Sequence, residues 1–499
     1  PLDSVSVLRG TDPVAAAKLE YTVANRFVQN HLARFNYEFA KDTVVRMMNA
    51  KNCDYSPKNG TFNGVQIVSG SKVIGSNGVM HLLSQVSPFA DNIFDYLASN
   101  PDVSTVYGII NSVEKTEFWP EGSTEGAMND NAEMIYVDSV YTNTNEILDA
   151  SFAKIKSEDS IYIAVIPVNS AWSGAVEKVA PLFKYHSSYS YDWSKDENKF
   201  MKTGVNAWKI NADSLQQVST QSAIITSMYF NPTEFKGVNK KDSAAVIQHF
   251  LYADSLIATN GTVFYNKAGE GNINPMFLDA QGNLIKPVRA SNGYIFPVDV
   301  YNIDPAYSFI PKIVELEAHA FNLASLTGCS SESGEVVVLT NETRIEDSVV
   351  AGVSDLKDDT YYYFKSTGGR MNINFPLRNI ASGRYKISVV MLPNKAYKPR
   401  SVDANGEPKV EEPTFDVRVY DDDFKTTLNK RAQNVPVRQD AVEKIVIWED
   451  FEIAKTYKNL PSGCESFPIL QISVTAAQQK KGNFDALSIK SVVLEPVRE

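Results

Sequence analysis

The chain has 499 residues, a formal net charge of −11 and 43% hydrophobic residues. This length predicts roughly two to four domains, and the hydrophobic content is that of folded globular proteins. The acidic balance disfavours a nucleic-acid partner, because a polyanion is bound by a basic face.

The three cysteines, Cys53, Cys329 and Cys464, lie far apart without CxxC spacing. They therefore indicate neither a zinc site nor a disulfide framework. No apolar run reaches about 18 residues, the length that spans a bilayer. We expect a processed or partial chain whose signal or lipid anchor lies upstream of Pro1.

A first helix is predicted close to the start of the chain. Asp12-Pro13 suit the N-cap and the first helical position, and apolar residues follow at near-helical spacing from Leu19 to Phe35. After residue 60 the pattern changes to two short β-like runs, 64–68 and 79–83, bounded by Gly, Ser and Asn. An α+β segment is therefore expected.

Helix and strand patterns alternate through the middle of the chain. Helical periodicity returns at residues 93–97, and Pro101 ends that helix and allows another to begin. A strand-like apolar run at 161–166 is followed by a helix-like run at 171–183. This order is that of a mixed α+β domain.

Two segments far apart in the chain share a short pattern. Ser76-Asn77-Gly78 and Ser291-Asn292-Gly293 each stand directly before an apolar strand, at the end of a long mixed segment. We interpret them as a two-copy repeat.

From about residue 311 the sequence alternates apolar and polar residues, as strands with one buried face do. The alternating apolar positions are Met371, Ile373 and Phe375, then Tyr385, Ile387 and Val389, then Phe415, Val417 and Val419. Further strands are predicted at 444–448, 469–474 and 487–494. About eight or nine strands with turn-rich connections predict an all-β sandwich of the jelly-roll type.

The earlier part of the chain resembles fasciclin domains. Residues 162–172 are similar to the first fasciclin signature, a strand followed by Pro, a Thr/Asn/Asp pair and Ala before an aromatic residue. Asn77-Gly78-Val79-Met80-His81 resembles the second signature, an Asn-Gly turn that leads into a strand; the later copy has Phe296 in place of the His. Asn30-His31 stands where the family has a Tyr-His pair.

The resemblance implies a multidomain protein with α+β fasciclin-like domains before the sandwich. Residues 1–90 would be the C-terminal half of one domain, and residues 91–308 a complete one enlarged by insertions near 116–145 and 185–215. The resemblance also implies adhesion and matrix or surface contacts.

Residues 311–499 resemble galactose-binding-like jelly rolls and carbohydrate-binding modules. The run 314–318 is similar to their first strand, Gly383-Arg384-Tyr385 to their central strand and 483–489 to their last strand. The resemblance implies a structural Ca²⁺ held by Glu317 and Asp485. The alternative is that both are exposed carboxylates, and no other cofactor is expected.

Aromatic side chains among polar residues are the candidate ligand-binding residues. They are suited to stacking on sugar rings or to a contact with a partner, and the alternative is that the rings pack onto their own domain. Trp119 carries the same two interpretations. The candidates are Tyr189, Tyr191, Trp193, Tyr361 and Tyr363.

Catalytic motifs are absent from the sequence. It contains five histidines and no GxSxG, HExxH, GxGxxG or P-loop pattern, so we expect no enzyme. A carboxylate pair of the glycosidase type stays open, since it leaves no sequence pattern. His31 and His81 are interpreted as structural histidines, and the acidic run 421–423 as a solvated turn.

The leading hypothesis is a non-catalytic adhesion or scaffold protein that contacts protein, matrix or glycan ligands outside the cell. The alternative is a glycan-capture surface lipoprotein of a polysaccharide uptake system, which binds through the C-terminal sandwich. Both place the chain outside the cell or on its surface, lipid-anchored to a bacterial outer membrane, with no other membrane contact.

Overall fold

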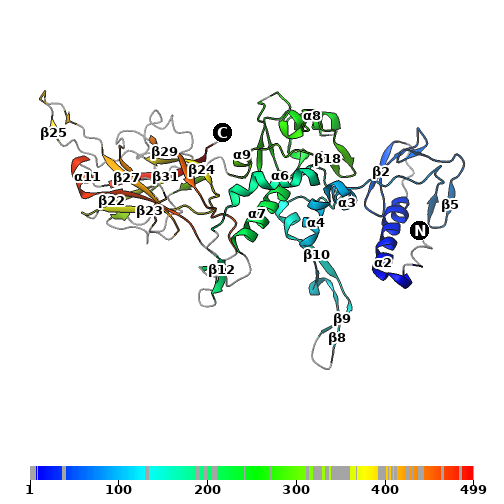
Figure 1. Ribbon diagram of the computed structural model, residues 1–499. Coiled ribbons are helices and arrows are strands. Elements are labelled where there is room, and N and C mark those ends of the chain that lie inside the picture. The colour runs from blue at the N-terminus through cyan, green and yellow to red at the C-terminus, as the bar shows by residue number, and fades with distance from the viewer. Residues whose placement is uncertain are drawn as a thin grey trace. The chain divides into compact units, whose positions relative to one another are not determined.

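The computed structural model describes two compact units (Figure 1). Unit 1 comprises Pro1–Ala175, Ile225–Thr262 and Asn266–Asn302; unit 2 comprises Val176–Ile224, Val263–Tyr265 and Ile303–Glu499. The domain boundaries expected near residues 90 and 310 stay predictions. The described residues are 7, 9–35, 41–129, 134–186, 190–194, 199–203, 211–240, 242–269, 271–310, 314–317, 329–331, 337–338, 360–366, 368–391, 401–402, 404–405, 408–409, 413–422, 426–428, 431–436, 443–461, 466–482 and 486–497.

Unit 1 begins with the predicted helix. The Asp12 carboxylate accepts a hydrogen bond from the backbone N–H of Ala15 at 3.0 Å, and Pro13 takes the first helical position. These caps start α2 (Pro13–Thr22), which continues into a π-helical turn, η1 (Val23–Val28), and a 3₁₀ turn, η2 (Gln29–His31). The predicted N-cap is therefore confirmed.

A small antiparallel sheet follows α2 in unit 1. Its core is formed by Val45, Met47 and the free Cys53, with Tyr55 and Phe62 packed against them. A separate hairpin, β5–β6, comes after it. The strands are β1 (Thr43–Arg46), β2 (Asn52–Ser56), β3 (Thr61–Phe62) and β4 (Val65–Gln66), then β5 (Val73–Gly75) and β6 (Gly78–Met80).

The second sheet of unit 1 has the strand order β14-β11-β18-β17. The strand-like run predicted at 161–166 is β11 (Tyr162–Pro167), which is buried along its whole length. It pairs in parallel with β18 (Gly293–Val298) and antiparallel with β14 (Tyr229–Phe230), while β17 (Val288–Ala290) pairs antiparallel with β18. A continuous apolar strand is expected at the centre of such a sheet.

Helices accompany this sheet in unit 1. Phe250 on α8 contacts the rings of Phe230, Phe277 and Phe296, with ring centroids 4.9–5.8 Å apart. This aromatic core places α8 against β14 and β18. The helices are α3 (Ile93–Ser99), α4 (Ser104–Ser112), α5 (Glu146–Ser151) and α8 (Ser243–Tyr252), with 3₁₀ turns η3 (Pro101–Val103), η6 (Pro232–Glu234) and η7 (Pro275–Phe277). A further helix, α6 (Asn169–Val179), begins in unit 1 and includes the unit boundary at Ala175.

Unit 2 contains a β-sandwich of two antiparallel sheets. The predicted alternation is confirmed, since all nine alternating apolar side chains are at most 2% exposed. One sheet has the order β20-β22-β31-β24-β29, with β19 on β31 and β21 on β22, and the other β23-β30-β27-β28. The strands are β19 (Val314–Glu317), β20 (Cys329–Ser331), β21 (Val337–Val338), β22 (Thr360–Ser366), β23 (Met371–Pro376), β24 (Gly383–Met391), β27 (Thr414–Tyr420), β28 (Ala432–Pro436), β29 (Glu443–Ile453), β30 (Ile469–Val474) and β31 (Ala486–Pro496).

Smaller elements complete unit 2. The ring of Phe264 on β16 contacts that of Phe309 on α9 at 6.3 Å. The hydroxyl of Ser382 donates to the carbonyl of Pro181 at 2.7 Å, which joins η5 to the start of β24. These elements are η5 (Ala180–Phe183), β12 (Ser190–Ser194), β13 (Lys199–Thr203), α7 (Ala212–Thr226), β16 (Val263–Tyr265), α9 (Pro305–Phe309), β25 (Ser401–Val402), β26 (Pro408–Lys409) and α11 (Ala476–Gly482).

Candidate functional site

The aromatic candidates near residue 190 fall on a two-stranded ribbon. Tyr191 and Trp193 belong to β12, which pairs with β13, and their side chains lie outside the described part, as does Tyr189 altogether. The neighbouring Tyr185 is buried, and its hydroxyl donates to the carbonyl of Lys458 at 2.7 Å. Burial raises the pKa of Tyr185 to about 12. This one ring of the segment packs onto its own unit.

The candidates of the sandwich are placed only by their backbone. Tyr361 and Tyr363 lie on β22, opposite Val337 and Ser488, and their side chains are outside the described residues. Phe364, next to them, is fully buried, as a strand with one core face requires. Sugar stacking by the two tyrosines stays a prediction.

The described residues do not show the predicted calcium ligands, Glu317 and Asp485, side by side. Glu317 ends β19 opposite Ser491, with its side chain outside the described residues, and Asp485 lies outside them altogether. Within the described ranges, no group of three or more His, Cys, Asp or Glu side chains is placed to hold a metal ion. The calcium site stays a prediction.

Asp421 and Asp422, the described part of the acidic run at the end of β27, do not form the solvated turn that the sequence predicted. Asp421 is buried, and its carboxylate accepts hydrogen bonds from Lys455 Nζ at 2.6 Å and from the Tyr457 hydroxyl at 2.7 Å. Asp422 accepts from the Ser466 hydroxyl at 2.7 Å. The partners come from the β29–β30 connection, far along the chain, so local sequence could not indicate this burial.

Replacing Asp421 by asparagine should make unit 2 less sensitive to acid. Burial acts to raise the pKa of Asp421, but the bonds from Lys455 and Tyr457 outweigh it and hold that pKa below its usual value of 3.8. A carboxyl group with a depressed pKa stabilises the fold above its unfolded pKa, and this contribution is lost as the pH falls through the folded one. Urea unfolding should therefore show a larger deficit for Asp421→Asn at pH 6 than at pH 3, whereas equal deficits would contradict the prediction.

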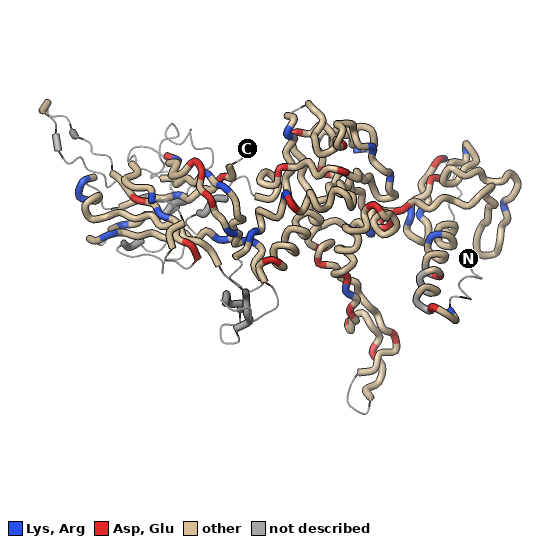
Figure 2. The backbone as a smooth tube through the Cα atoms, viewed as in Figure 1, with Lys and Arg blue, Asp and Glu red and all other residues tan. Residues whose placement is uncertain are grey.

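A β-arm, formed by residues 114–129 and 134–145, projects from the helices of unit 1 (Figure 1). Its base is the antiparallel pair β7 (Glu114–Phe118) and β10 (Tyr141–Asn145), and its tip is the hairpin of β8 (Thr124–Met128) and β9 (Met134–Asp138). The 3₁₀ turn η4 (Pro120–Gly122) connects base and tip. Acidic residues recur along the arm (Figure 2).

The arm carries apolar side chains that face solvent. The ring of Phe118 contacts the rings of Tyr136 and Tyr141, at centroid distances of 4.7 and 5.7 Å. Further exposed apolar residues are Trp119, Met128, Ile135 and Val137, of which Val137 is 78% exposed. Scattered exposed apolar residues are common, but a group of aromatic and aliphatic side chains on one projecting element is typical of a contact surface.

Trp119 is held in one position although it is 45% exposed. Its backbone N–H donates to the carbonyl of Val140 at 2.9 Å, and its carbonyl accepts from the Ser123 hydroxyl at 2.8 Å. A Cβ at Gly122 would come within 2.2 Å of the indole ring, so the glycine leaves the space that the ring occupies. The ring is therefore presented in a defined orientation.

The base of the arm is fixed to unit 1 by charged and amide groups. Asn145 Nδ2 donates to the carbonyl of Ile110 and to Glu114 Oε2, both at 2.8 Å, and Lys156 Nζ lies 2.6 Å from Glu114 Oε1. Burial acts to raise the pKa of Glu114, but the bonds from Lys156 and Asn145 lower it overall. Glu114 is therefore held ionised at the base of the arm.

The sequence indicated only part of this surface. The length of 116–145 indicates an insertion and Trp119 is a candidate contact residue by sequence, whereas Phe118, Tyr136 and Tyr141 are not among the candidates. Their signal was the alternation of apolar and polar residues in a segment without helix period, which does not distinguish a solvent-exposed ribbon from a core strand.

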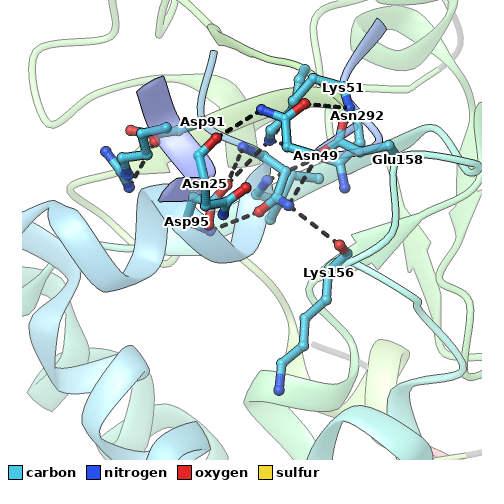
Figure 3. Close-up of polar contacts among 12 residues, drawn as sticks. Asn25, Asn49, Lys51, Asp91, Asp95, Lys156, Glu158 and Asn292 are labelled. Atoms are coloured by element: carbon cyan, nitrogen blue, oxygen red, sulfur yellow. Dashed lines mark hydrogen bonds and ion pairs between the residues drawn. The ribbon is translucent and has the colours of Figure 1, made fainter. Parts of the chain in front are cut away.

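A second polar site lies around the buried Lys51 (Figure 3). Its Nζ contacts Glu158 Oε1 at 2.6 Å, Asp95 Oδ2 at 3.1 Å and the Ser291 hydroxyl at 3.0 Å. The ring of Phe89 lies 4.8 Å from the same nitrogen. Three acceptors match the three donors of an ammonium group, so this lysine is fully satisfied within the protein.

Asparagine side chains extend the Lys51 site on both sides. Asn92 accepts from the Asp95 backbone N–H at 2.7 Å and donates to Glu158 Oε1 at 3.1 Å, which caps α3. Asn49 donates to Asn30 Oδ1 and accepts from the Lys51 N–H, both at 3.1 Å. These hydrogen bonds connect residues 25–51 to the segments at 92–95, 158 and 291. We interpret the network as structural, because it fixes these segments to one another.

His31 has the structural role expected of it. Its Nδ1 lies 2.6 Å from the carbonyl of Phe27, and its Nε2 accepts from the Ser87 backbone N–H at 3.0 Å. The adjacent Asn30 donates to the carbonyls of Ser87 and Pro88 at 3.3 and 3.4 Å. The Asn30-His31 pair therefore fixes the segment at 87–88 to the end of the first helix.

Across the described ranges, no helix is both long enough and apolar enough to cross a membrane.

Comparisons with known proteins leave the chain without an assigned family. No family model matches it, and no curated protein matches it. The C-terminal CBM6 of the marine laminarinase LamC from Zobellia galactanivorans is 9% identical, with a TM-score of 0.20 over 37% of this chain and 98% of that one. A family 35 carbohydrate-binding module from Clostridium thermocellum is 7% identical, with a TM-score of 0.21 over 38% and 100%. A Paenibacillus xanthan lyase is 10% identical, with a TM-score of 0.23 over 49% and 20%. At these TM-scores the likeness carries no inference about ligand or activity.

Proposed function

We propose that this protein is a non-catalytic adhesion or scaffold protein of the cell surface, and that the β-arm is its contact surface. The observation that supports this proposal is the group of exposed aromatic and aliphatic side chains on the arm, with Trp119 held in a fixed orientation. A few residues supply most of the binding energy in protein interfaces, and these residues are enriched in tryptophan, tyrosine and arginine.

The charge of the arm favours a protein partner of complementary chemistry. Glu117, Glu121, Glu125 and Asp138 are exposed beside the apolar residues. A partner surface with an apolar centre and a rim of Lys or Arg would match both features, since rim charges guide association while apolar anchors supply affinity. The fasciclin-like architecture, the surface location and the lipid anchor belong to the same proposal.

The alternative function is glycan capture by a surface lipoprotein through the sandwich. Its candidate residues are Tyr361 and Tyr363, with Glu317 and Asp485 as calcium ligands. Unit 2 comprises residues 176–224 as well as 303–499. Deleting the sandwich would therefore also remove packing contacts of the earlier segment. Substitutions in the full chain therefore separate the two functions better than truncation does.

Replacing Trp119 by alanine should weaken attachment of the full chain to cells or to an array of extracellular-matrix proteins. The expected loss is about thirty-fold in affinity, the effect of about 2 kcal/mol for an interface anchor. The control is Tyr252→Ala, which removes an exposed aromatic ring outside the arm and should leave attachment unchanged. Circular dichroism checks that both variants are folded.

A glycan array decides between the two functions. Attachment that needs Trp119 and is indifferent to Tyr361→Ala and Tyr363→Ala supports adhesion through the arm. Saturable glycan binding that is lost in the two tyrosine variants and retained in Trp119→Ala would instead establish glycan capture and overturn the proposal.

A further inference from the structure

A lysine amine and two carboxylates are in direct contact at the Lys51 site of unit 1 (Figure 3). Lys51 Nζ lies 2.6 Å from Glu158 Oε1 and 3.1 Å from Asp95 Oδ2. The side chain of Lys51 is 6% exposed, that of Glu158 5% and that of Asp95 27%. An amine, a carboxyl group that it can attack and a second carboxylate are therefore held together where little water reaches them.

The amine is held against the Asp95 carboxyl group from its other sides. The Ser291 hydroxyl, in the second Ser-Asn-Gly segment, lies 3.0 Å from Lys51 Nζ, and the ring of Phe89 lies 4.8 Å from it. A buried ion pair becomes a neutral amine and acid more easily than an exposed pair does, because the interior solvates charge poorly. Proton transfer would then leave the nitrogen lone pair beside Asp95 Cγ, which is one bond from the oxygen that Nζ contacts.

Asp95 is positioned by the capping box of α3. Its backbone N–H donates to Asn92 Oδ1 at 2.7 Å, and its Oδ2 accepts from the Asn92 backbone N–H at 3.2 Å. In acyl transfer, a backbone donor on the carbonyl oxygen stabilises the negative charge that develops there. The start of α3 thus both fixes the Asp95 carboxyl group and supplies such a donor.

Glu158 is placed to carry protons between the two reacting groups. Its Oε1 contacts Lys51 Nζ and also accepts from Asn92 Nδ2 at 3.1 Å, which fixes its orientation. A carboxylate in hydrogen-bond contact with an attacking nitrogen is suited to act first as a general base and then as a general acid.

We propose that Lys51 and Asp95 condense to an intramolecular isopeptide bond, with Glu158 as the catalytic proton carrier. Lys51 Nζ attacks Asp95 Cγ, so a C–N bond forms and one C–O bond of the carboxyl group breaks. Two of the three ammonium protons pass through Glu158 to the departing oxygen, which leaves as water. Glu158 ends as the carboxylate that it was, and no oxidant or further reactant takes part. Groups held in contact reach effective concentrations of about 10⁵–10⁸ M, which favours the amide.

The bond would join the start of the first small sheet to α3. Lys51 directly precedes β2, and Asp95 lies in the first turn of α3, 44 positions later. A covalent loop of this kind restricts the unfolded chain as a disulfide does, but reducing agents do not open it. The proposal does not depend on the function proposed for the β-arm.

The intact mass of the denatured full chain tests the proposal. The parent chain is expected to be lighter than its sequence by one water molecule, and a protease digest should contain a branched peptide that joins Lys51 to Asp95. In Lys51→Arg and in Asp95→Ala the mass should match the sequence. Lys51→Arg keeps the positive charge but has no amine that can condense, so it separates the loss of the crosslink from the loss of the ion pair.

Glu158→Gln should slow the loss of water by about a hundred-fold or more, the usual contribution of a general acid–base group. The measurement is mass against time after cell-free synthesis. The matched control is Asp159→Asn, since Asp159 is the neighbouring carboxylate but is 67% exposed and pairs with Arg46; it should react like the parent. Circular dichroism shows whether each variant is folded, and the branched peptide of the parent chain does not depend on any variant.

Four results would overturn the proposal in whole or in part. A folded parent chain with the mass of its sequence would show that no condensation occurs. Loss of ammonia instead of water would assign Asn92 as the group attacked, and a branched peptide through Glu158 would assign that residue. An unchanged rate in Glu158→Gln would remove its catalytic role.

Discussion

Replacing Gly293 by alanine is expected to destabilise unit 1 by at least about 4 kcal/mol, the range of the most damaging single substitutions. Two causes act together. Gly293 has φ +148°, a backbone conformation that L-residues with a Cβ rarely adopt. The added Cβ would also lie 1.8 Å from the carbonyl oxygen of Tyr162, so β11 and β18 would have to separate.

The separation would also release the turn before Gly293. Asn292 is buried, its Oδ1 accepts from the Ile93 N–H at 2.9 Å, and its Nδ2 donates to the carbonyls of Ile155 and Ser157 at 2.8 and 3.0 Å. If the Asn292 side chain moved out of its place, these buried donors and acceptors would be left unpaired, at a further cost of about 1–3 kcal/mol each. The start of α3 and the segment before β11 would loosen with it.

The control for this prediction is Gly78→Ala in the β5–β6 hairpin. Gly78 pairs with Gly75 across a Ser-Asn turn, as Gly293 pairs with Ala290, but it has open space around it and no left-handed φ. The expected change is therefore within about 0.5 kcal/mol. Urea unfolding followed by tryptophan fluorescence measures both variants. Similar stabilities of the two variants would show that β11 does not pack against Gly293 in solution.

Replacing Lys51 by methionine is expected to cost unit 1 about 3–5 kcal/mol, as for a buried ion pair that loses one partner. The Lys51 side chain is 6% exposed and that of Glu158 5%, so the carboxylate would be left buried without its cation. Asp95 would lose the same partner. Methionine has nearly the length of lysine. The substitution would therefore remove the charge and its hydrogen bonds but little side-chain volume.

The matched control is Arg46→Met. Arg46 pairs with Asp159 at 2.5 Å and joins the same two stretches of chain, but both side chains are largely exposed. Exposed ion pairs contribute about 0–1 kcal/mol, so this variant should unfold close to the parent. Adding Glu158→Gln to Lys51→Met should restore part of the lost stability in urea unfolding. A double variant less stable than the single one would show that the charge of Glu158 is not the cause.

Sequence patterns predicted those elements whose signal is local. The Asp12-Pro13 cap, the strand predicted at 161–166 and the alternation of the sandwich strands each depend on neighbours a few residues apart, and each is confirmed. The pairing of β11 with β18 joins residues 131 positions apart, from 162 to 293, and no local period encodes such a contact. The two fasciclin-like signatures lie on these adjacent strands, but the family itself stays a proposal.

Site residues were harder to predict than strands, for a related reason. The ionic partners of Lys51 come from residues 95 and 158, and the hydrogen-bond donors to Asp421 from residues 455 and 457. A charged residue in sequence is most simply solvated, and only the fold shows which ones are buried with partners. Aromatic residues are likewise ambiguous, since the same ring composition serves a core or a contact surface.

The parallel pairing of β11 and β18 also determines how unit 1 would respond to tension. Tyr162 lies opposite Gly293 and Pro167 opposite Val298, so the two strands begin at the same end. A force that pulls on the chain before Tyr162 and after Val298 acts along the strands in opposite directions and loads all six pairs at once, in shear. For the adhesion function proposed above, an attachment under load would last as long as the forced unfolding rate of this ladder permits.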